Sequence, residues 1–172
     1  MRLNGFSLEI MGGTKPKGPL RFFLRAPVYL YRWGCGRLLG NRFLLLIHVG
    51  RRTGARHQTV LEVMEYRKEG PEFVVMSGFG RNADWLLNIQ AKSDPEVIVG
   101  SQRFTAAYRL LGEEEAMKVV RNYERQNRFM APVVSYVLSR LLGWQYSGSE
   151  ADLRRLVAQL PLTGFRPRIG SP

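Results

Sequence analysis

A short, glycine-rich basic segment separates two strand-like runs of this sequence. The apolar run Phe43–Ile47 precedes the segment Gly50–His57, and the run Thr59–Val63 follows it. Strands joined by so short a connection favour antiparallel pairing. The segment also holds three arginines and a histidine, and forked guanidinium donors next to glycine backbone suit a bound phosphate or carboxylate. The sequence therefore predicts an antiparallel hairpin whose bend binds an anion.

Further strand-like runs and helical patterns follow along the chain. The connections between the strands are short, and Lys68–Pro71 is a clear turn. Closing such a sheet into a small barrel removes its exposed edges. The predicted fold class is α+β, a barrel of mainly antiparallel strands with peripheral helices. We expect strands at 43–49, 57–67, 72–77, 96–99, 103–110 and 162–168, and helices at 83–92, 113–126, 129–142 and 149–159.

The basic charge is concentrated in the first third of the chain. The formal net charge is +12, and residues 1–56 contribute eleven Lys or Arg against one acid. An anionic small molecule, an anionic membrane surface or a nucleic acid could each explain this excess. Because the sequence has no helix-turn-helix pattern and no motif for stacking on single strands, we do not expect a nucleic-acid partner.

The N-terminal region is predicted to differ from the rest of the chain. Residues 1–18 are expected to form a flexible segment, and residues 19–172 a single domain. The pattern over 19–39 predicts an amphipathic helix with a kink or break at Pro27. That helix either lies at a membrane surface or covers the barrel. No uncharged apolar run approaches about 18 residues, so we expect no spanning helix, and no cleaved signal peptide is expected.

The only cysteine, Cys35, cannot form an intrachain disulfide. This favours a reducing compartment and a cytoplasmic location, and the residue itself is expected to be a small buried side chain. One cysteine and two histidines give no metal-ligand spacing, so no metal site is expected.

Two motifs taken together resemble the deazaflavin-dependent nitroreductase family. They are Gly50-Arg51-Arg52-Thr53-Gly54 and Asp84-Trp85-Leu86-Leu87-Asn88, and the similarity extends over residues 20–168. Members of that family are split β-barrel proteins that use coenzyme F420. The resemblance therefore implies a split β-barrel and an F420-dependent oxidoreductase. We also expect a possible homodimer, because split barrels often pair.

The resemblance also assigns parts of the site. The basic turn would hold the phosphate of the deazaflavin side chain, the strand after it would pass beside the ring, and the segment 77–80 and the helix with Trp85 would close the site. The residues assigned to the cofactor in this way are Arg51, Arg52, Thr53, Gly54, Arg56, His57, Thr59, Val60, Ser77, Gly78, Phe79, Gly80, Trp85 and Asn88.

The sequence departs from the family pattern at three places. The family commonly has Lys at position 52 and Pro-Arg at 56–57, where this chain has Arg52 and Arg56-His57. Which of Arg56 and His57 faces the anion is therefore open. Many relatives have Tyr where this chain has Leu86. The residues alone also allow plainer roles: a solvated basic turn, Trp85 in the core, Asn88 and Ser77 as ordinary helix and turn residues, and His48 and His57 as structural strand residues.

The implied chemistry is hydride transfer from the reduced deazaflavin to an electron-poor acceptor such as a quinone, an enone or a nitroaromatic compound. The cofactor supplies the reactivity, which agrees with the lack of a nucleophile–base motif. Glu62 is a candidate for the substrate pocket. The candidate proton donors are Tyr66, Tyr108, Tyr123, Tyr136 and Tyr146. The alternatives are a split-barrel protein that binds FMN, FAD or haem, and a non-enzymatic membrane-peripheral binding protein.

Overall fold

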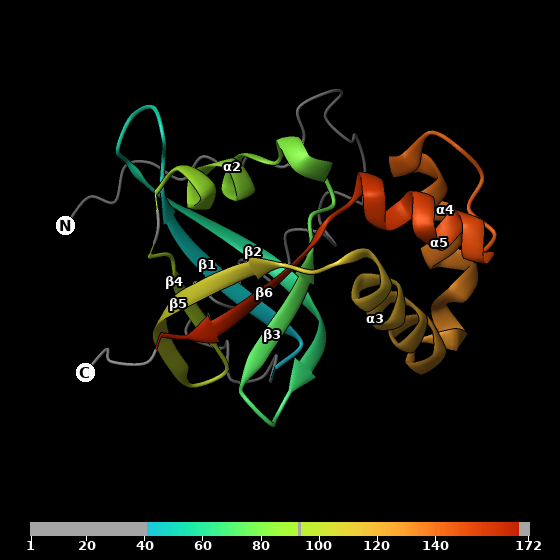
Figure 1. Ribbon diagram of the computed structural model, residues 1–172, viewed down its shortest axis with the longest axis horizontal. Coiled ribbons are helices and arrows are strands. Elements are labelled where there is room, and N and C mark those ends of the chain that lie inside the picture. The colour runs from blue at the N-terminus through green and yellow to red at the C-terminus, as the bar shows by residue number, and fades with distance from the viewer. Residues whose placement is uncertain (1–40, 93, 169–172) are drawn as a thin grey trace.

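The computed structural model describes residues 41–92 and 94–168. The segment 1–18, the helix predicted at 19–39 and Cys35 lie outside these residues. Six antiparallel strands close into a barrel in the order β1-β2-β3-β6-β5-β4 (Figure 1). The strands are β1 (Phe43–Val49), β2 (Arg56–Arg67), β3 (Glu72–Met76), β4 (Glu96–Val99), β5 (Gln102–Leu110) and β6 (Leu162–Pro167). The predicted antiparallel barrel, an α+β split-barrel fold, is confirmed.

Helices surround the barrel on two sides. Figure 1 shows α2 across one end of the barrel, next to the β1–β2 connection, and α3, α4 and α5 grouped to one side. The helices are η2 (Gly80–Asn82), α2 (Asp84–Ala91), α3 (Glu113–Gln126), η3 (Arg128–Met130), α4 (Ala131–Leu142) and α5 (Glu150–Gln159). Among the described residues, none of these helices has the length and apolar character needed to cross a membrane.

The helix predicted at 129–142 is in fact two elements, and this part of the prediction was wrong. A short 3₁₀ turn, η3, ends at Met130, and α4 begins at Ala131. The second residue of α4 is Pro132, which has no backbone N–H to donate to the preceding turn. An α-helix can begin at such a residue but cannot run through it undisturbed.

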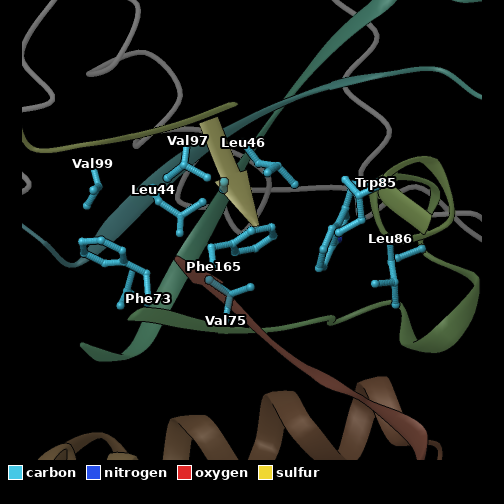
Figure 2. Close-up of a cluster of buried hydrophobic side chains, with 13 residues drawn as sticks. Leu44, Leu46, Phe73, Val75, Trp85, Leu86, Val97, Val99 and Phe165 are labelled. Carbon is cyan, nitrogen blue, oxygen red and sulfur yellow. The ribbon is translucent and has the colours of Figure 1, made fainter. Parts of the chain in front are cut away.

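The barrel interior holds the first of two hydrophobic cores. Alternate residues of β1, Leu44 and Leu46, point inward and are fully buried, as the period of two in a strand requires. From α2, Trp85, Leu86 and Ile89 pack onto the same core and seal this end of the barrel (Figure 2). Helix α2 is therefore held against the barrel by apolar burial, which fixes where its polar side chains lie.

A second core lies between the outer face of the barrel and the helices α3 and α5. Val74 of β3 and Leu162 of β6 pack there with Val120 of α3 and Leu156 of α5. The two cores share β3, whose five residues are buried except for Met76, which is partly buried. After Glu72 the strand is a continuous apolar run, because both of its faces are covered.

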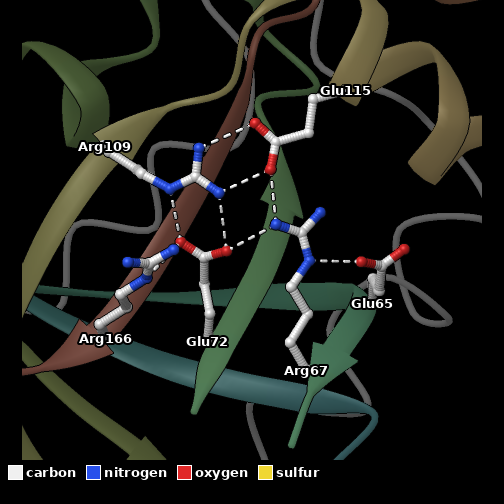
Figure 3. Close-up of polar contacts among 6 residues, drawn as sticks. All are labelled: Glu65, Arg67, Glu72, Arg109, Glu115 and Arg166. Carbon is white, nitrogen blue, oxygen red and sulfur yellow. Dashed lines mark hydrogen bonds and ion pairs between the residues drawn. The ribbon is translucent and has the colours of Figure 1, made fainter. Parts of the chain in front are cut away.

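One buried carboxylate organises the side of the barrel opposite the basic turn. Glu72 of β3 is fully buried and accepts hydrogen bonds from Arg109 at 2.7 and 2.8 Å, Arg166 at 2.8 Å and Arg67 at 2.9 Å (Figure 3). Burial by itself would raise the pKa of Glu72, but the hydrogen bonds from Arg109 and Arg166 bring the pKa below its ordinary value. The network joins β2, β3, β5 and β6.

The same network reaches α3 through Glu115. Its carboxylate accepts from Arg109 at 2.6 and 2.8 Å and from Arg67 at 2.5 Å. The hydrogen bond from Arg109 is the largest cause that lowers the pKa of Glu115, to about 2. With Glu65 bound to Arg67, three acids and three arginines balance one another (Figure 3). We interpret the cluster as structural, since each of its charges has a partner.

Candidate functional site

The basic turn between β1 and β2 is closed by its own backbone. The Gly50 N–H donates to the Ala55 carbonyl at 2.8 Å, and the Gly54 N–H donates to the Gly50 carbonyl at 2.9 Å. Gly54 has a φ of +69°, a conformation that favours glycine. A Cβ at Gly50 would lie 2.8 Å from His57 Nε2. The bend therefore requires glycine at position 54, and a side chain at position 50 would have to displace the His57 ring.

Helix α2 anchors this turn through Arg51. The Arg51 backbone N–H donates to Asn88 Oδ1 at 3.0 Å, and Arg51 Nη1 donates to Asp84 Oδ1 at 2.7 Å and to Asn88 Oδ1 at 2.9 Å. Asp84 and Asn88 are four residues apart, so they lie on the same face of the helix. The two sequence motifs that define the resemblance are thus in direct contact.

Arg52, the next residue, is placed differently. Its side chain is exposed and makes no hydrogen bond or ion pair with any residue in the described part of the chain. Thr53 contributes its hydroxyl inside the turn, where Oγ1 accepts from the Ala55 N–H at 3.3 Å. Within residues 41–92 and 94–168, Arg52 is consequently the guanidinium of the turn that has no partner.

Arg56 and His57 lie on opposite faces of β2, because neighbouring residues of a strand alternate. Arg56 is exposed, and its Nη2 donates to Glu96 Oε2 at 2.9 Å. His57 pairs with His48 across the β1–β2 ladder, and their rings stack with centroids 5.6 Å apart. His57 also touches the turn at Gly50, whereas Arg56 already has a carboxylate partner.

Thr59 and Val60 are likewise on opposite faces of the strand. Thr59 pairs with Leu46, which points into the barrel, and Val60 pairs with Leu45. The Thr59 Oγ1 atom lies 3.3 Å from His48 Nε2. The two residues were predicted together as neighbours of the cofactor ring, but a ligand lying on one face of β2 would meet only one of these two side chains.

The segment from Ser77 to Gly80 forms a tight turn after β3. Ser77 is buried, and its Oγ donates to the Gly80 carbonyl at 2.7 Å. Gly80 has a φ of +68°, and a Cβ there would lie 2.9 Å from the Gln159 carbonyl oxygen. Gly78 has open space around it, and the Phe79 side chain is 41% exposed. Gly78 and Phe79 are therefore the accessible part of this segment.

Trp85 and Leu86 face the barrel core. The Trp85 indole is 5% exposed and packs beside Phe165, with ring centroids 6.3 Å apart (Figure 2). Leu86 is 1% exposed. At the position where many relatives have a tyrosine, this chain therefore has a side chain that fills the core and has no hydroxyl group.

Glu62 and Tyr123 form a pair on the outside of the barrel. Tyr123 of α3 donates its hydroxyl proton to Glu62 Oε1 at 2.7 Å. Burial raises the pKa of Tyr123 well above its ordinary value, and the hydrogen bond to Glu62 raises it further. Glu62 is exposed, and Arg42 Nε lies 3.7 Å from it. The pair places a protonated phenol next to the predicted substrate-pocket residue.

The other tyrosines have different surroundings. Tyr146 is buried and donates to Glu124 at 2.6 Å. Tyr66 stacks on Phe73, and Tyr108 packs against the barrel core. Tyr136 is 65% exposed. Of the five candidate proton donors, Tyr123 alone is hydrogen-bonded to a residue predicted to line the site.

Sequence reasoning did not assign Asp84 or His48 to the site. Asp84 pairs with Arg51, and the signal was its spacing of four residues from Asn88 within the helix motif. His48 is 5% exposed, and its Nδ1 lies 3.1 Å from Asn88 Nδ2. A histidine in an apolar strand gave no sign of this contact, because the partner comes from forty residues later in the chain.

The family model of F420H2-dependent quinone reductases matches residues 26–132, more than half of the 172 residues. The chain belongs to this family. An F420H2-dependent quinone reductase is an oxidoreductase that uses coenzyme F420, so the enzyme class and the cofactor predicted for this chain are confirmed.

Several solved structures are similar to this chain at low sequence identity. One is an F420H2-dependent reductase, FDR-A, with 15% identity over 74% of this chain and 96% of that chain, at a TM-score of 0.43. Another is an FMN-binding protein from Nostoc punctiforme PCC 73102 related to pyridoxamine 5′-phosphate oxidase, with 12% identity, 88% and 81% coverage and a TM-score of 0.43. A third, described as a domain-swapped dimer, has 16% identity, 82% and 100% coverage and a TM-score of 0.42. No curated protein matched significantly.

Proposed function

We propose that the chain transfers a hydride from reduced F420 to a quinone-type acceptor, and that the basic turn holds the acidic tail of the cofactor. This assignment rests on which arginines of the turn already have hydrogen-bond partners. Arg51 donates to Asp84 and Asn88, while Arg52 is exposed and has no partner among the residues that the structure describes. A fixed bend that presents one unpaired guanidinium suits a phosphate or carboxylate group.

The residues of the turn have different proposed roles. Arg51 attaches the bend to α2, Arg52 contacts the anion, and His57 lies against the bend at Gly50. Arg56 has its own partner in Glu96, which Arg103 also contacts. Because Glu96 already binds Arg56, we infer that Arg52 rather than Arg56 contacts the anion.

The outer face of β2 is the proposed acceptor side. Val60 and Glu62 lie on this face, and Tyr123 reaches it from α3. The bound reduced deazaflavin supplies the hydride. Tyr123 is protonated at neutral pH, and burial raises its pKa further, so its hydroxyl gives a proton only to a strongly basic group such as the oxyanion of a reduced acceptor. Glu62 orients that hydroxyl.

The decisive experiment compares two arginine variants in a titration with F420. We expect Arg52→Ala to weaken F420 binding about tenfold or more, because a charge-assisted hydrogen bond contributes roughly 1.5–3 kcal/mol. Arg56→Ala removes an equal charge four residues away and should change the affinity little. Quenching of F420 fluorescence measures both, and FMN, FAD and haem serve as competing ligands. Equal affinities of the two variants, or tighter binding of another cofactor, would contradict the proposal.

Membrane contact and dimer formation stay predictions. The basic helix predicted at 19–39 lies outside the described residues, so the proposal that it touches an anionic membrane rests on its charge and aromatic content alone. A lipophilic quinone is encountered at a bilayer, which makes such a contact compatible with the proposed reaction.

A further inference from the structure

A buried polar chain connects the basic turn to the inside of the barrel. It runs from Arg51 through Asn88 and His48 to Thr59, by way of α2, β1 and β2. Asn88 and His48 are each 5% exposed. Buried polar groups must satisfy their hydrogen bonds within the protein, so the direction of each bond in this chain can be worked out from chemistry.

The direction of the hydrogen bonds is set at Arg51, whose guanidinium and backbone N–H can only donate. Its backbone N–H and its Nη1 both approach the same atom of the Asn88 amide, at 3.0 and 2.9 Å. That atom must be the oxygen, since an NH₂ group cannot accept a hydrogen bond. The amide orientation of Asn88 is thereby fixed, and its nitrogen faces His48.

The protonation of His48 follows from this orientation. The Asn88 NH₂ group donates to His48 Nδ1 at 3.1 Å, so Nδ1 carries a lone pair and no proton. The neutral imidazole must then carry its proton on Nε2, which donates to Thr59 Oγ1 at 3.3 Å. A protonated ring would point an N–H group at the NH₂ group of Asn88, and the hydrogen bond between these two residues would be lost.

The surroundings of the ring favour the neutral form. Burial is the largest cause that lowers the pKa of His48, the charge of His57 also lowers it and Asp84 opposes both, so that the pKa is about 4. Arg51 is the other charged group at this junction, and it is paired with Asp84. The electrostatic environment and the hydrogen-bond geometry thus agree on a ring that stays neutral at physiological pH.

We propose that Asn88 and His48 are positioning residues, which lock the Arg51 turn onto α2 through a neutral His48 protonated on Nε2. The family motif suggested Asn88 as a cofactor ligand, but its oxygen accepts from Arg51 and one N–H of its amide donates to His48. The effect on F420 rests on the function proposed above, because a locked turn holds Arg52 in place. The tautomer and the locking do not depend on that function.

The tautomer is tested on the full chain without ligand. Long-range ¹H–¹⁵N NMR spectra should show His48 as the Nε2–H tautomer with no titration between about pH 5 and 8. In Asn88→Asp, a carboxylate that still accepts from Arg51 would capture a proton on Nδ1, and the His48 pKa should rise toward neutrality. An Nδ1–H tautomer in the natural chain, or an unmoved titration in Asn88→Asp, would overturn the assignment.

The locking is tested by amide hydrogen exchange at Arg51. We expect Asn88→Leu to speed this exchange at least about tenfold, because the backbone N–H loses its acceptor. Asn88→Asp should retain the protection, and Gln90→Leu, an exposed site on the same helix, is the matched control. Unchanged protection in Asn88→Leu would refute the positioning role.

Kinetics then separate positioning from catalysis. For a folded Asn88→Leu, the KM for F420 should rise about tenfold while kcat at saturating F420 stays close to that of the natural chain. A fall in kcat with an unchanged KM would contradict this proposal. If the natural chain binds no F420, the proposed function fails, whereas the NMR and exchange results still decide whether His48 and Asn88 lock the turn.

Discussion

At the scale of single residues, the site depends on which charges already have partners. Arg51 and Arg52 are adjacent and chemically identical. Arg51 is bound by Asp84 and Asn88 of α2, whereas Arg52 has no partner among the described residues. The tyrosines also differ in their partners, and the Tyr123 hydroxyl donates to Glu62. Of the two arginines, removing Arg51 is therefore expected to disturb the turn itself, whereas removing Arg52 is expected to change anion binding.

Tyr123→Phe should lower kcat about 100-fold, because a positioned general acid contributes roughly 10²–10⁴ in rate. The phenylalanine keeps the ring packing and removes only the proton that lies on Glu62. The KM for F420 should hardly change. Tyr136→Phe, at an exposed position, is the control. Steady-state rates with a quinone acceptor check the prediction, and full activity of Tyr123→Phe would assign the proton transfer elsewhere.

At the scale of elements, the sequence predicted most of this fold because its signals are local. Alternating apolar residues and short glycine turns located the strands to within one or two residues, and Glu113–Gln126 matches its predicted helix. The contacts between elements were not predictable in this way. Asn88 meets His48 only because α2 packs over the barrel, and Glu72 draws its arginines from three other strands.

The site could be predicted only in part for the same reason. The family motifs located two segments that the structure brings into contact, but they did not give the surroundings of individual side chains. Strand alternation separates Arg56 from His57 and Thr59 from Val60, and that rule was available from the sequence. The ion pair of Arg56 with Glu96 was not, because it depends on the register between β1 and β4.

The packing of β6 on β3 gives a prediction at this scale. A Cβ at Gly164 would lie 2.5 Å from Glu72 Oε1, and three arginines hold that carboxylate in place. We therefore expect Gly164→Ala to destabilise the fold by about 1–3 kcal/mol, the usual cost of overpacking. Gly78→Ala, where a Cβ meets nothing within 4 Å, is the matched control. Urea unfolding of both variants measures the difference, and equal stability would mean that the carboxylate can move.

At the scale of the whole molecule, two groups of titratable side chains at opposite ends of the structure govern stability in acid. The Glu72–Glu115 network ties the strands to α3, and the His48 chain ties α2 to the barrel. Each group has a folded-state pKa below its ordinary value. Protons therefore bind the unfolded chain first, and stability falls as pH falls.

The two groups act in different windows of pH. His48 begins to destabilise the fold below its unfolded pKa of 6.5, and its effect levels off below about 4. The gap between these values corresponds to about 3 kcal/mol for this buried ring. Glu115 stabilises the fold above 4.5, and this contribution is lost as pH falls toward its folded pKa of about 2. Its share is of the order of 1 kcal/mol, because solvent screens the partly exposed carboxylate.

Urea unfolding measured from pH 7 to pH 2 should therefore show two successive losses of stability. His48→Asn removes the titrating ring, so it should flatten the first loss, between about pH 6.5 and 4, and leave the second. Glu115→Gln should do the reverse. If His48→Asn keeps the slope above pH 5, the ring is not held neutral by the fold, and the polar chain from Arg51 to Thr59 does not have the direction derived from its geometry.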